Sequence, residues 1–327
     1  RRLRLVWSRP DRKLSFVHDK IRESVLGELS EQRVQDMHCR AGKYFETHDP
    51  DQIFEMAYHF DAAKQHEKAL PYAVRAAEAA RASFSLVSAE LQLRIAVRAL
   101  RHASTEVRHH VEMLMSDVLM LQGNYVEAQE WLDQARGSAE QGTDQAKVLL
   151  KRGELYFKRG NKDQAVTCFE ASLRQLGQPV CHGYGSLAVR LAVEVFRQTR
   201  HSLFPSLCRR YPQPPDASDA MALSLYSKIA HAYWYTRDKY YTLWAHLRGM
   251  NGAETYAPTS YLAQAYSEHA PVMTLLRWQS RGTRYGLRSL ALRQSFNDLW
   301  GQGQTRNFLS ILLYSFSRFH DCIEQAR

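Results

Sequence analysis

The pair His18-Asp19, in the stretch FVHDKIRESVL (16–26), is the first place where side chains of catalytic type stand together. A histidine beside an acid could accept a phosphoryl group, or it could ligate a metal in a phosphohydrolase built on an HD pair. Compared with the His-acid-x-Arg box of sensor kinases, which accepts a phosphoryl group, HDKIRE has one residue too many and lacks the proline that follows the box. No Gly-rich nucleotide-binding segment follows either. For the second, no further His and Asp stand out at matching helical positions. We interpret the pair as a junction between a hairpin and a helix, with Asp19 as the N-cap.

Three polar residues form a second candidate, because His102, Glu106 and His109 have the i, i+4, i+7 spacing of one helix face. Such a face could ligate a metal ion. No further cluster of ligand-type residues lies nearby in the sequence, so we expect exposed polar residues and no metal.

Sequence motifs of nucleotide-binding and hydrolytic enzymes are absent. GxxxxGKS, GxGxxG, GxSxG and the kinase signature segments do not occur. The cysteines are odd in number, form no CxxC pair and have no partnered histidine at an informative spacing, which indicates small core residues in a reducing, cytoplasmic compartment. They are Cys39, Cys168, Cys181, Cys208 and Cys322. We therefore expect no catalytic site, no cofactor and no metal in this chain, and hence no enzyme.

Aromatic residues are concentrated between 226 and 278. In a helical solenoid, such residues could line a concave groove for a ligand or peptide. Aromatic stripes at helical spacing belong more often to the core, so both interpretations stay open. The candidate groove residues are Tyr233, Trp234, Tyr240, Tyr241, Trp244 and Tyr266.

The composition is that of a soluble globular chain of one large or two ordinary domains: 327 residues, 45% hydrophobic and 24% charged. Its 16 glycines and 10 prolines are too few for the turns of a β-sandwich. Apolar stretches such as 308–316 are shorter than the roughly 20 residues of a membrane span. No signal-peptide core is present at the N-terminus. We expect a cytoplasmic protein without a membrane partner.

The net charge of +10 would suit a nucleic-acid-binding protein, but its distribution does not. Residues 1–22 hold eight Lys/Arg against two acids, which leaves only +4 for the rest of the chain. A solenoid that binds nucleic acid should carry basic residues along its whole length. We therefore expect no nucleic-acid partner. A second, smaller cluster of basic residues is interpreted as a solvated face. This cluster consists of Arg197, Arg200, Arg209 and Arg210.

The N-terminal residues alternate between apolar and polar over 3–7 and again over 14–18, on both sides of SRPDRK. This pattern predicts a β-hairpin. Because an isolated hairpin is marginal in water, we expect it to belong to a larger fold upstream. The chain has no starting methionine, which agrees with its being a piece of a longer protein.

After Asp19 the apolar spacing becomes helical, with Ile21, Val25 and Leu29 on one face. A second helix is predicted from about Glu31. A third is predicted over Gln52–Ala63, and its apolar stripe consists of Ile53, Met56, Ala57 and Phe60.

Two segments repeat each other: GNYVEAQEWLDQA from Gly123 and GNKDQAVTCFEAS from Gly160. In each segment the glycine ends one helix. A small residue follows five positions after the glycine, a large apolar residue nine positions after it, and a second small residue twelve positions after it. The matching residues are Ala128, Leu132 and Ala135 in the first segment, and Ala165, Phe169 and Ser172 in the second. Leu149, Gly153 and Tyr156 supply the helix before Gly160.

The same spacing recurs in two further segments. EKALPYAVRAAEAA presents Ala69, Ala73 and Ala76, and SRFHDCIEQA aligns Cys322 with Ala128. This is the spacing of tetratricopeptide-type helical hairpins, whose period is about 34 residues. Breaks at 176–185 and 211–219 interrupt the pattern.

FVHDKIRESVL followed by FEMAYHFDAAKQHEKALPYAVRAAEAAR resembles the region after the ATPase module in bacterial STAND-type (AAA-like) signalling ATPases, which are fused to Ser/Thr protein kinases or sensor histidine kinases. The later YAPTSYLAQAYSEHAPVMTLL looks like the C-terminal repeats of that family. The resemblance implies that the hairpin is the wing of a winged helix. It also implies that ATP and Mg²⁺ bind an upstream module, so no nucleotide-binding residue can be assigned in this chain.

The predicted fold class is therefore all-α: a tetratricopeptide-like helical-hairpin solenoid with a short N-terminal β-hairpin or winged-helix remnant. The expected parts are the remnant (1–30), helical repeats (31–210), a Pro-rich break (211–216) and further tetratricopeptide-like repeats (217–327).

The expected function is non-catalytic regulation or scaffolding in a signalling ATPase/kinase. The expected partners are the chain's own upstream ATPase module, a downstream output domain, and a protein or peptide on the solenoid. The alternatives are a free-standing protein-binding adaptor and the inducer-sensing arm of a DNA-binding regulator.

Overall fold

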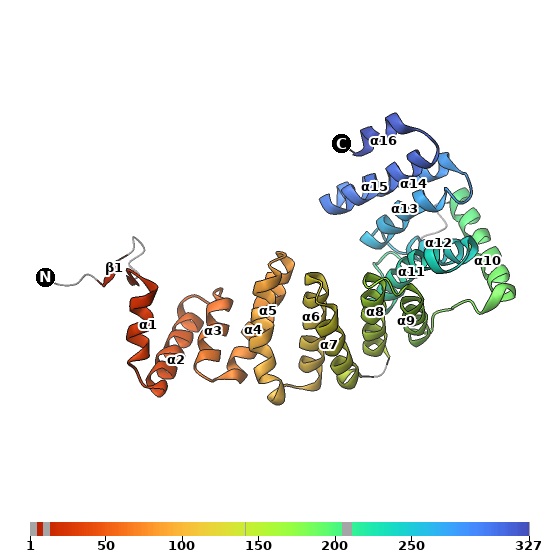
Figure 1. Cartoon of the computed structure of the whole chain (residues 1–327). Helices are drawn as coiled ribbons and strands as arrows, with labels where there is room; N and C mark the ends of the chain where they lie inside the picture. Colours follow the sequence, from red (N-terminus) through yellow and green to blue (C-terminus); the bar gives the residue numbers. More distant parts are fainter. Residues whose placement is uncertain (1–4, 9–13, 141, 205–210, 327) are drawn as a thin grey trace. The chain divides into compact units, whose positions relative to one another are not determined.

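The computed structural model describes residues 5–8, 14–140, 142–204 and 211–326. These residues are almost entirely helical, as the all-α prediction requires (Figure 1). Contacts divide the chain into two compact units, Arg1–Ser138 and Ala139–Arg327. The break predicted at 211–216 lies inside the second unit, and the predicted division into parts stays a prediction.

The first unit begins with two short antiparallel strands, β1 (Val6–Ser8) and β2 (Leu14–Phe16), with Val6 opposite Phe16. The alternating residues predicted this pairing, while the turn predicted between the strands lies outside the described residues. Helix α1 (Asp19–Gly27) follows.

The N-cap of α1 is His18 and not Asp19, which corrects the sequence prediction. His18 has extended backbone angles, and its ring Nδ1 accepts a hydrogen bond from the amide of Lys20 at 3.2 Å. Asp19 is already the first helical residue, where its carboxylate is still favourably placed near the positive end of the helix dipole.

The remaining helices of the first unit pack against their neighbours in chain order. The start predicted at Glu31 is confirmed, and Met56, Ala57 and Phe60 are buried as the stripe predicted. The helices are α2 (Glu31–His48), α3 (Ile53–Ala62), α4 (His66–Ala82), α5 (Leu86–Ala99), the 3₁₀ turn η1 (Leu100–His102), α6 (Thr105–Gln122) and α7 (Tyr125–Ser138).

In the second unit, α8 pairs with α9, α11 with α12, α13 with α14, and α15 with α16, while α10 packs against α12. Helix α13 also contacts α11 and α15, so these three helices are neighbours along one face. The bounds are α8 (Thr143–Lys158), α9 (Lys162–Gln175), α10 (Gly183–Leu203), α11 (Ala217–Thr236), α12 (Lys239–Ala253), α13 (Ser260–Val272), α14 (Gln279–Ser295), α15 (Leu299–Ser315) and α16 (Phe319–Ala326).

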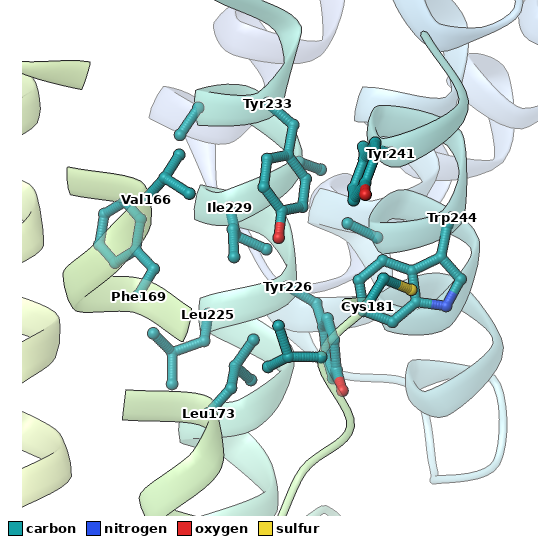
Figure 2. Packing of buried hydrophobic residues seen from close by; sticks show 14 of the residues in the cluster. Val166, Phe169, Leu173, Cys181, Leu225, Tyr226, Ile229, Tyr233, Tyr241 and Trp244 are labelled. Atoms are coloured by element: carbon teal, nitrogen blue, oxygen red, sulfur yellow. The ribbon is translucent and has the colours of Figure 1, made fainter. Parts of the chain in front are cut away.

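Aromatic rings from α11 and α12 pack together within one hydrophobic cluster of the second unit (Figure 2). The Tyr226 ring stands edge-on to the indole of Trp244, and the Tyr233 ring meets that of Tyr241 in the same way, with centroids 6.0 and 5.4 Å apart. Such edge-to-face pairs stabilise a core beyond the area they bury.

A residue in the left-handed backbone region ends many of the helices. Gly123 and Gly160 each have φ of +84°, and the next amide donates to the carbonyl five residues back, as from Asn124 to Leu119 at 2.9 Å. This is the Schellman arrangement, which satisfies the last carbonyls of a helix. The repeated GN pair predicted these two helix ends. Among the described residues, five that are not glycine adopt the same conformation: Lys64, Phe84, Arg277, Asn297 and Ser317.

Two substitutions at these turns, one that introduces glycine and one that removes it, should change stability in opposite directions. Phe84 is 81% exposed with φ of +58°, so Phe84→Gly should raise the free energy of unfolding by about 0.5–1 kcal/mol through relief of backbone strain. A Cβ at Gly123 would meet no atom within 4 Å, so Gly123→Ala adds only strain and should cost about 1 kcal/mol. Urea unfolding of both variants measures this, and a more stable Gly123→Ala protein would contradict it.

Glycine also permits the close contact of paired helices at two positions. A Cβ on Gly153 of α8 would lie 2.5 Å from the Phe169 ring of α9, and a Cβ on Gly42 of α2 would lie 2.9 Å from the Phe60 ring of α3. In both pairs a large ring on the second helix occupies the space that glycine leaves on the first.

Candidate functional site

Two adjoining cavities of about 330 and 220 Å³ lie over α11, α13 and α15. They share the lining residues Ser227, His246 and Glu268, so they adjoin at these side chains, and the pair is called here the α11–α13–α15 groove. One end is lined by Tyr261 and Trp300, and the other by apolar and aromatic side chains. The apolar end includes Trp234, Tyr235, Val272, Phe308 and Ile311.

Glu268 provides the acceptor group at the centre of the groove. Its Oε1 accepts hydrogen bonds from Ser227 Oγ at 2.5 Å and Gln264 Nε2 at 2.8 Å. Burial raises the pKa of this carboxyl despite both hydrogen bonds. Glu268 makes no ion pair with any described residue, so its charge can be compensated by a donor group of a ligand.

The cations of the groove are already paired. Lys228 Nζ lies 2.9 Å from Glu154 Oε1, and the buried Arg293 binds Asp298 through Nη1 at 2.6 Å. Arg293 Nη2 also donates to Gln264 Oε1 at 2.5 Å, which connects the arginine to the amide that supports Glu268. The groove therefore offers a fixed network of polar groups rather than an excess of positive charge.

A chain of hydrogen bonds assigns the tautomers of two buried histidines. Arg281 Nε can only donate, so His269 Nε2, at 3.0 Å, must accept. The proton of His269 is then on Nδ1, which donates to His246 Nε2 at 2.9 Å. This assignment leaves His246, a lining residue of both cavities, with its own proton on Nδ1 as a hydrogen-bond donor.

These histidines should make the second unit less stable in acid. Burial lowers the pKa of His246 to about 3 and that of His269 well below its usual value. The unfolded chain takes up these protons below about pH 6.5 whereas the folded chain does not, so stability falls by about 1.4 kcal/mol per pH unit for each histidine. The loss extends from about pH 6.5 down to the folded pKa.

His246→Gln keeps an acceptor for His269 and should reduce the slope of unfolding free energy against pH by one such step, about 1.4 kcal/mol per unit between about pH 6 and 4. Urea unfolding across this range is the measurement, with His320→Gln on the surface as the matched variant. A slope equal to that of the unchanged protein would contradict the lowered pKa of His246.

The six aromatic residues predicted to line a groove occupy different environments. Tyr233, Tyr241 and Trp244 are buried in the core. Tyr266 donates its hydroxyl proton to Glu254 and meets the Tyr285 ring edge-on.

The other two predicted aromatics, Trp234 and Tyr240, are exposed, and of these Trp234 lines the groove while Tyr240 lines neither of its cavities. The binding role of the set stays a prediction. Sequence reasoning missed Ser227, His246 and Glu268. A signal existed on α11, where Ser224, Ser227, Lys228 and His231 recur at helical spacing within an aromatic-rich segment.

The polar face proposed from His102, Glu106 and His109 is only partly exposed. His109 is buried between α6 and α7, where its Nδ1 lies 3.0 Å from the carbonyl of Ala135, so the expectation of an exposed residue was wrong there. Helix α7 ends beside it, and its free terminal carbonyl groups give the ring a partner. His102 and Glu106 are exposed. Among the described residues, no three His, Cys, Asp or Glu side chains are grouped to hold a metal ion.

No described helix combines the length and the apolar character needed to cross a membrane. No protein-family model and no curated protein matches the sequence. Among solved structures, the crystal structure of BtubC (BKLC) from P. vanneervenii is similar to this chain, with a TM-score of 0.47 and 14% identity over 80% of this chain and 89% of BtubC.

Proposed function

We propose that this chain is a non-catalytic binding arm that holds an extended peptide segment of a partner protein in the α11–α13–α15 groove. The adjacency of the two cavities at Ser227, His246 and Glu268 carries the proposal, because an extended chain needs a path longer than one pocket. Glu268 accepts a hydrogen bond from a peptide N–H, and the Nδ1–H of His246 donates one to a peptide carbonyl. Side chains of the peptide then contact Trp234 and Ile311, which are 42% and 43% exposed.

The repeated helix pairs support a tetratricopeptide-like solenoid as the scaffold of this groove. Alternate helices of such solenoids line one binding surface, and α11, α13 and α15 are alternate helices that contact each other in order. The αL turns and the glycine–aromatic contacts recur between helix pairs, as they should if each pair is one repeat.

The N-terminal elements support attachment to a further module. Apolar side chains of β1, β2 and α1 are exposed rather than buried, including Val6, Trp7, Phe16 and Val25. A winged helix completed by the preceding part of a signalling ATPase would cover them. On this proposal ATP and Mg²⁺ bind that upstream module, and the peptide shifts the balance between its resting and active arrangements.

Selection of short unstructured peptides on the immobilised chain tests the groove. We expect the selected peptides to bind the Trp234→Ala and Ile311→Ala variants roughly tenfold more weakly, while Phe84→Ala, a large exposed side chain in the first unit, retains the affinity. Equal losses in all three variants, or none in the first two, would show that the peptides bind elsewhere.

Nucleotide turnover tests the coupling. In the parent protein, removal of residues 31–327 should change the basal rate of turnover, because the arm would no longer hold the ATPase in its resting arrangement. An unchanged rate would favour the free-standing adaptor instead.

A further inference from the structure

A separate cavity of about 260 Å³ lies in the second unit, lined by residues of α10, α11 and α12. A neighbouring cavity of about 240 Å³ shares Arg197 and Arg248 with it. We call the pair the arginine cavity. Its larger part shares Leu223 with the α11–α13–α15 groove, but neither part is lined by His246 or Glu268.

Two guanidinium groups from different helices meet at one point of this cavity. Arg197 Nη1 of α10 and Arg248 Nη1 of α12 lie 3.0 and 3.6 Å from the same oxygen, Oε1 of the buried Glu194. The other oxygen of Glu194 accepts a hydrogen bond from Asn251 Nδ2 at 2.8 Å. One carboxylate thus holds two arginines side by side and compensates only one of their charges.

Further polar groups of the cavity have no partner among the described residues. Arg200, one helical turn after Arg197, makes no ion pair with a described residue, and Arg248 Nε is buried without a hydrogen-bond partner among them. Asn251, only 3% exposed, also leaves its Oδ1 without such a partner. The lining therefore offers several guanidinium N–H groups and one amide acceptor together.

The charges of the lining favour an anion with two negative charges. Among the described residues, four arginines line the two parts, Arg190 being the fourth, against the two carboxylates Glu194 and Asp219. Asp219 is engaged by the Tyr256 hydroxyl, which donates to it at 2.5 Å. Because Arg197 and Arg248 converge on one atom, the excess charge is concentrated, which suits a compact dianion better than two separated carboxylates.

We propose that the arginine cavity binds a small phosphate monoester. The phosphoryl oxygens accept hydrogen bonds from Arg197, Arg200 and Arg248, and a hydroxyl group of the ester donates to Asn251 Oδ1. The stacked rings of Tyr211 and Tyr256, with centroids 5.2 Å apart, border the same cavity and give the organic part an apolar surface. On this proposal Arg197 and Arg200, interpreted from the sequence as part of a solvated face, bind the phosphoryl group.

The arrangement of the arginines argues for a small molecule rather than a nucleic-acid backbone. A polyanion needs a row of cations along its length, whereas this cavity brings Arg197 and Arg248 to one carboxylate and has the size of a small ligand.

Calorimetric titration of the full chain with glycerol phosphate, inorganic phosphate and succinate tests the proposal. We expect glycerol phosphate to bind more tightly than inorganic phosphate, and succinate to bind at least about tenfold more weakly than either. Arg200→Gln should weaken glycerol phosphate binding about tenfold, because it removes one charge-assisted contact. Arg284→Gln, the same change on an exposed arginine of α14 that lines neither part, should leave binding unchanged.

Absence of phosphate binding, equal binding of succinate, or an equal loss in Arg284→Gln would each overturn the proposal. Circular dichroism melting curves show whether the variants are folded. Arg197→Gln provides a second variant in the same cavity and should also weaken binding. The readout is independent of the peptide-binding assay, so failure of one proposal leaves the other standing.

Discussion

Gly153→Val is expected to lower the free energy of unfolding of the second unit by about 3 kcal/mol, because overpacking a close-packed site costs about 1–3 kcal/mol or more. A Cβ alone would already lie 2.5 Å from Cε1 and 2.6 Å from Cδ1 of Phe169. Phe169, on α9, is only 2% exposed and packs against α8 and the core around α11, so its ring cannot move aside without disturbing other side chains.

Urea unfolding followed by tryptophan fluorescence measures the effect. Gly303→Ala in α15 is the matched control, because its Cβ would meet no atom within 4 Å. It should stabilise the helix by up to about 1 kcal/mol, the intrinsic preference of alanine over glycine. Combining Gly153→Val with Phe169→Leu should recover part of the loss. A Gly153→Val protein as stable as the unchanged one would mean that the two helices are not held at this distance.

Most of the helical architecture could be predicted from periodicity and from the GN pairs. The small residues after Gly123 and Gly160 are buried where the repeat predicted, since Ala128, Ala135 and Ala165 are fully inaccessible. Periodicity reports which face of a helix is apolar, and in a chain of packed helix pairs that information fixes most of the core.

The turns without glycine could not be predicted in the same way. Phe84 and Arg277 adopt the left-handed conformation although their side chains disfavour it. The packing of the two flanking helices offsets this local cost. That packing depends on residues far along the chain and cannot be predicted from the residues of the turn. The same reason explains His18, because whether it or Asp19 is the N-cap depends on where the extended backbone of β2 ends.

The candidate sites were harder to predict than the fold. The aromatic residues between 226 and 266 indicated a candidate binding groove there. Trp234 and Trp244 both lie in this range, but Trp234 is exposed and Trp244 is buried, which residue type alone does not predict. The arginine cavity combines α10 with α12 across a break in the helical pattern, and Arg197 and Arg248 stand far apart in the sequence. Their guanidinium groups meet at one carboxylate only because these helices pack together, and the sequence spacing does not predict this contact.

Trp244→Ala is expected to lower the free energy of unfolding of the second unit by about 3–5 kcal/mol, as for other buried aromatic residues replaced by alanine. The Trp244 indole is 1% exposed and packs edge-on against Tyr226 in the middle of the core (Figure 2). Its removal takes away this contact and leaves a cavity that the rigid helix pair α11–α12 cannot close.

Trp234→Ala is the matched comparison, since it removes the same side chain from the same helix pair at a position that is 42% exposed. It should cost less than about 1 kcal/mol, because a partly exposed side chain leaves no closed cavity. Urea unfolding of the two variants distinguishes the core role of Trp244 from the groove role of Trp234. Peptide binding should be reduced in Trp234→Ala while its fold is retained. If Trp234→Ala were the more destabilised variant, Trp234 would be a core residue and the groove would lose its apolar end.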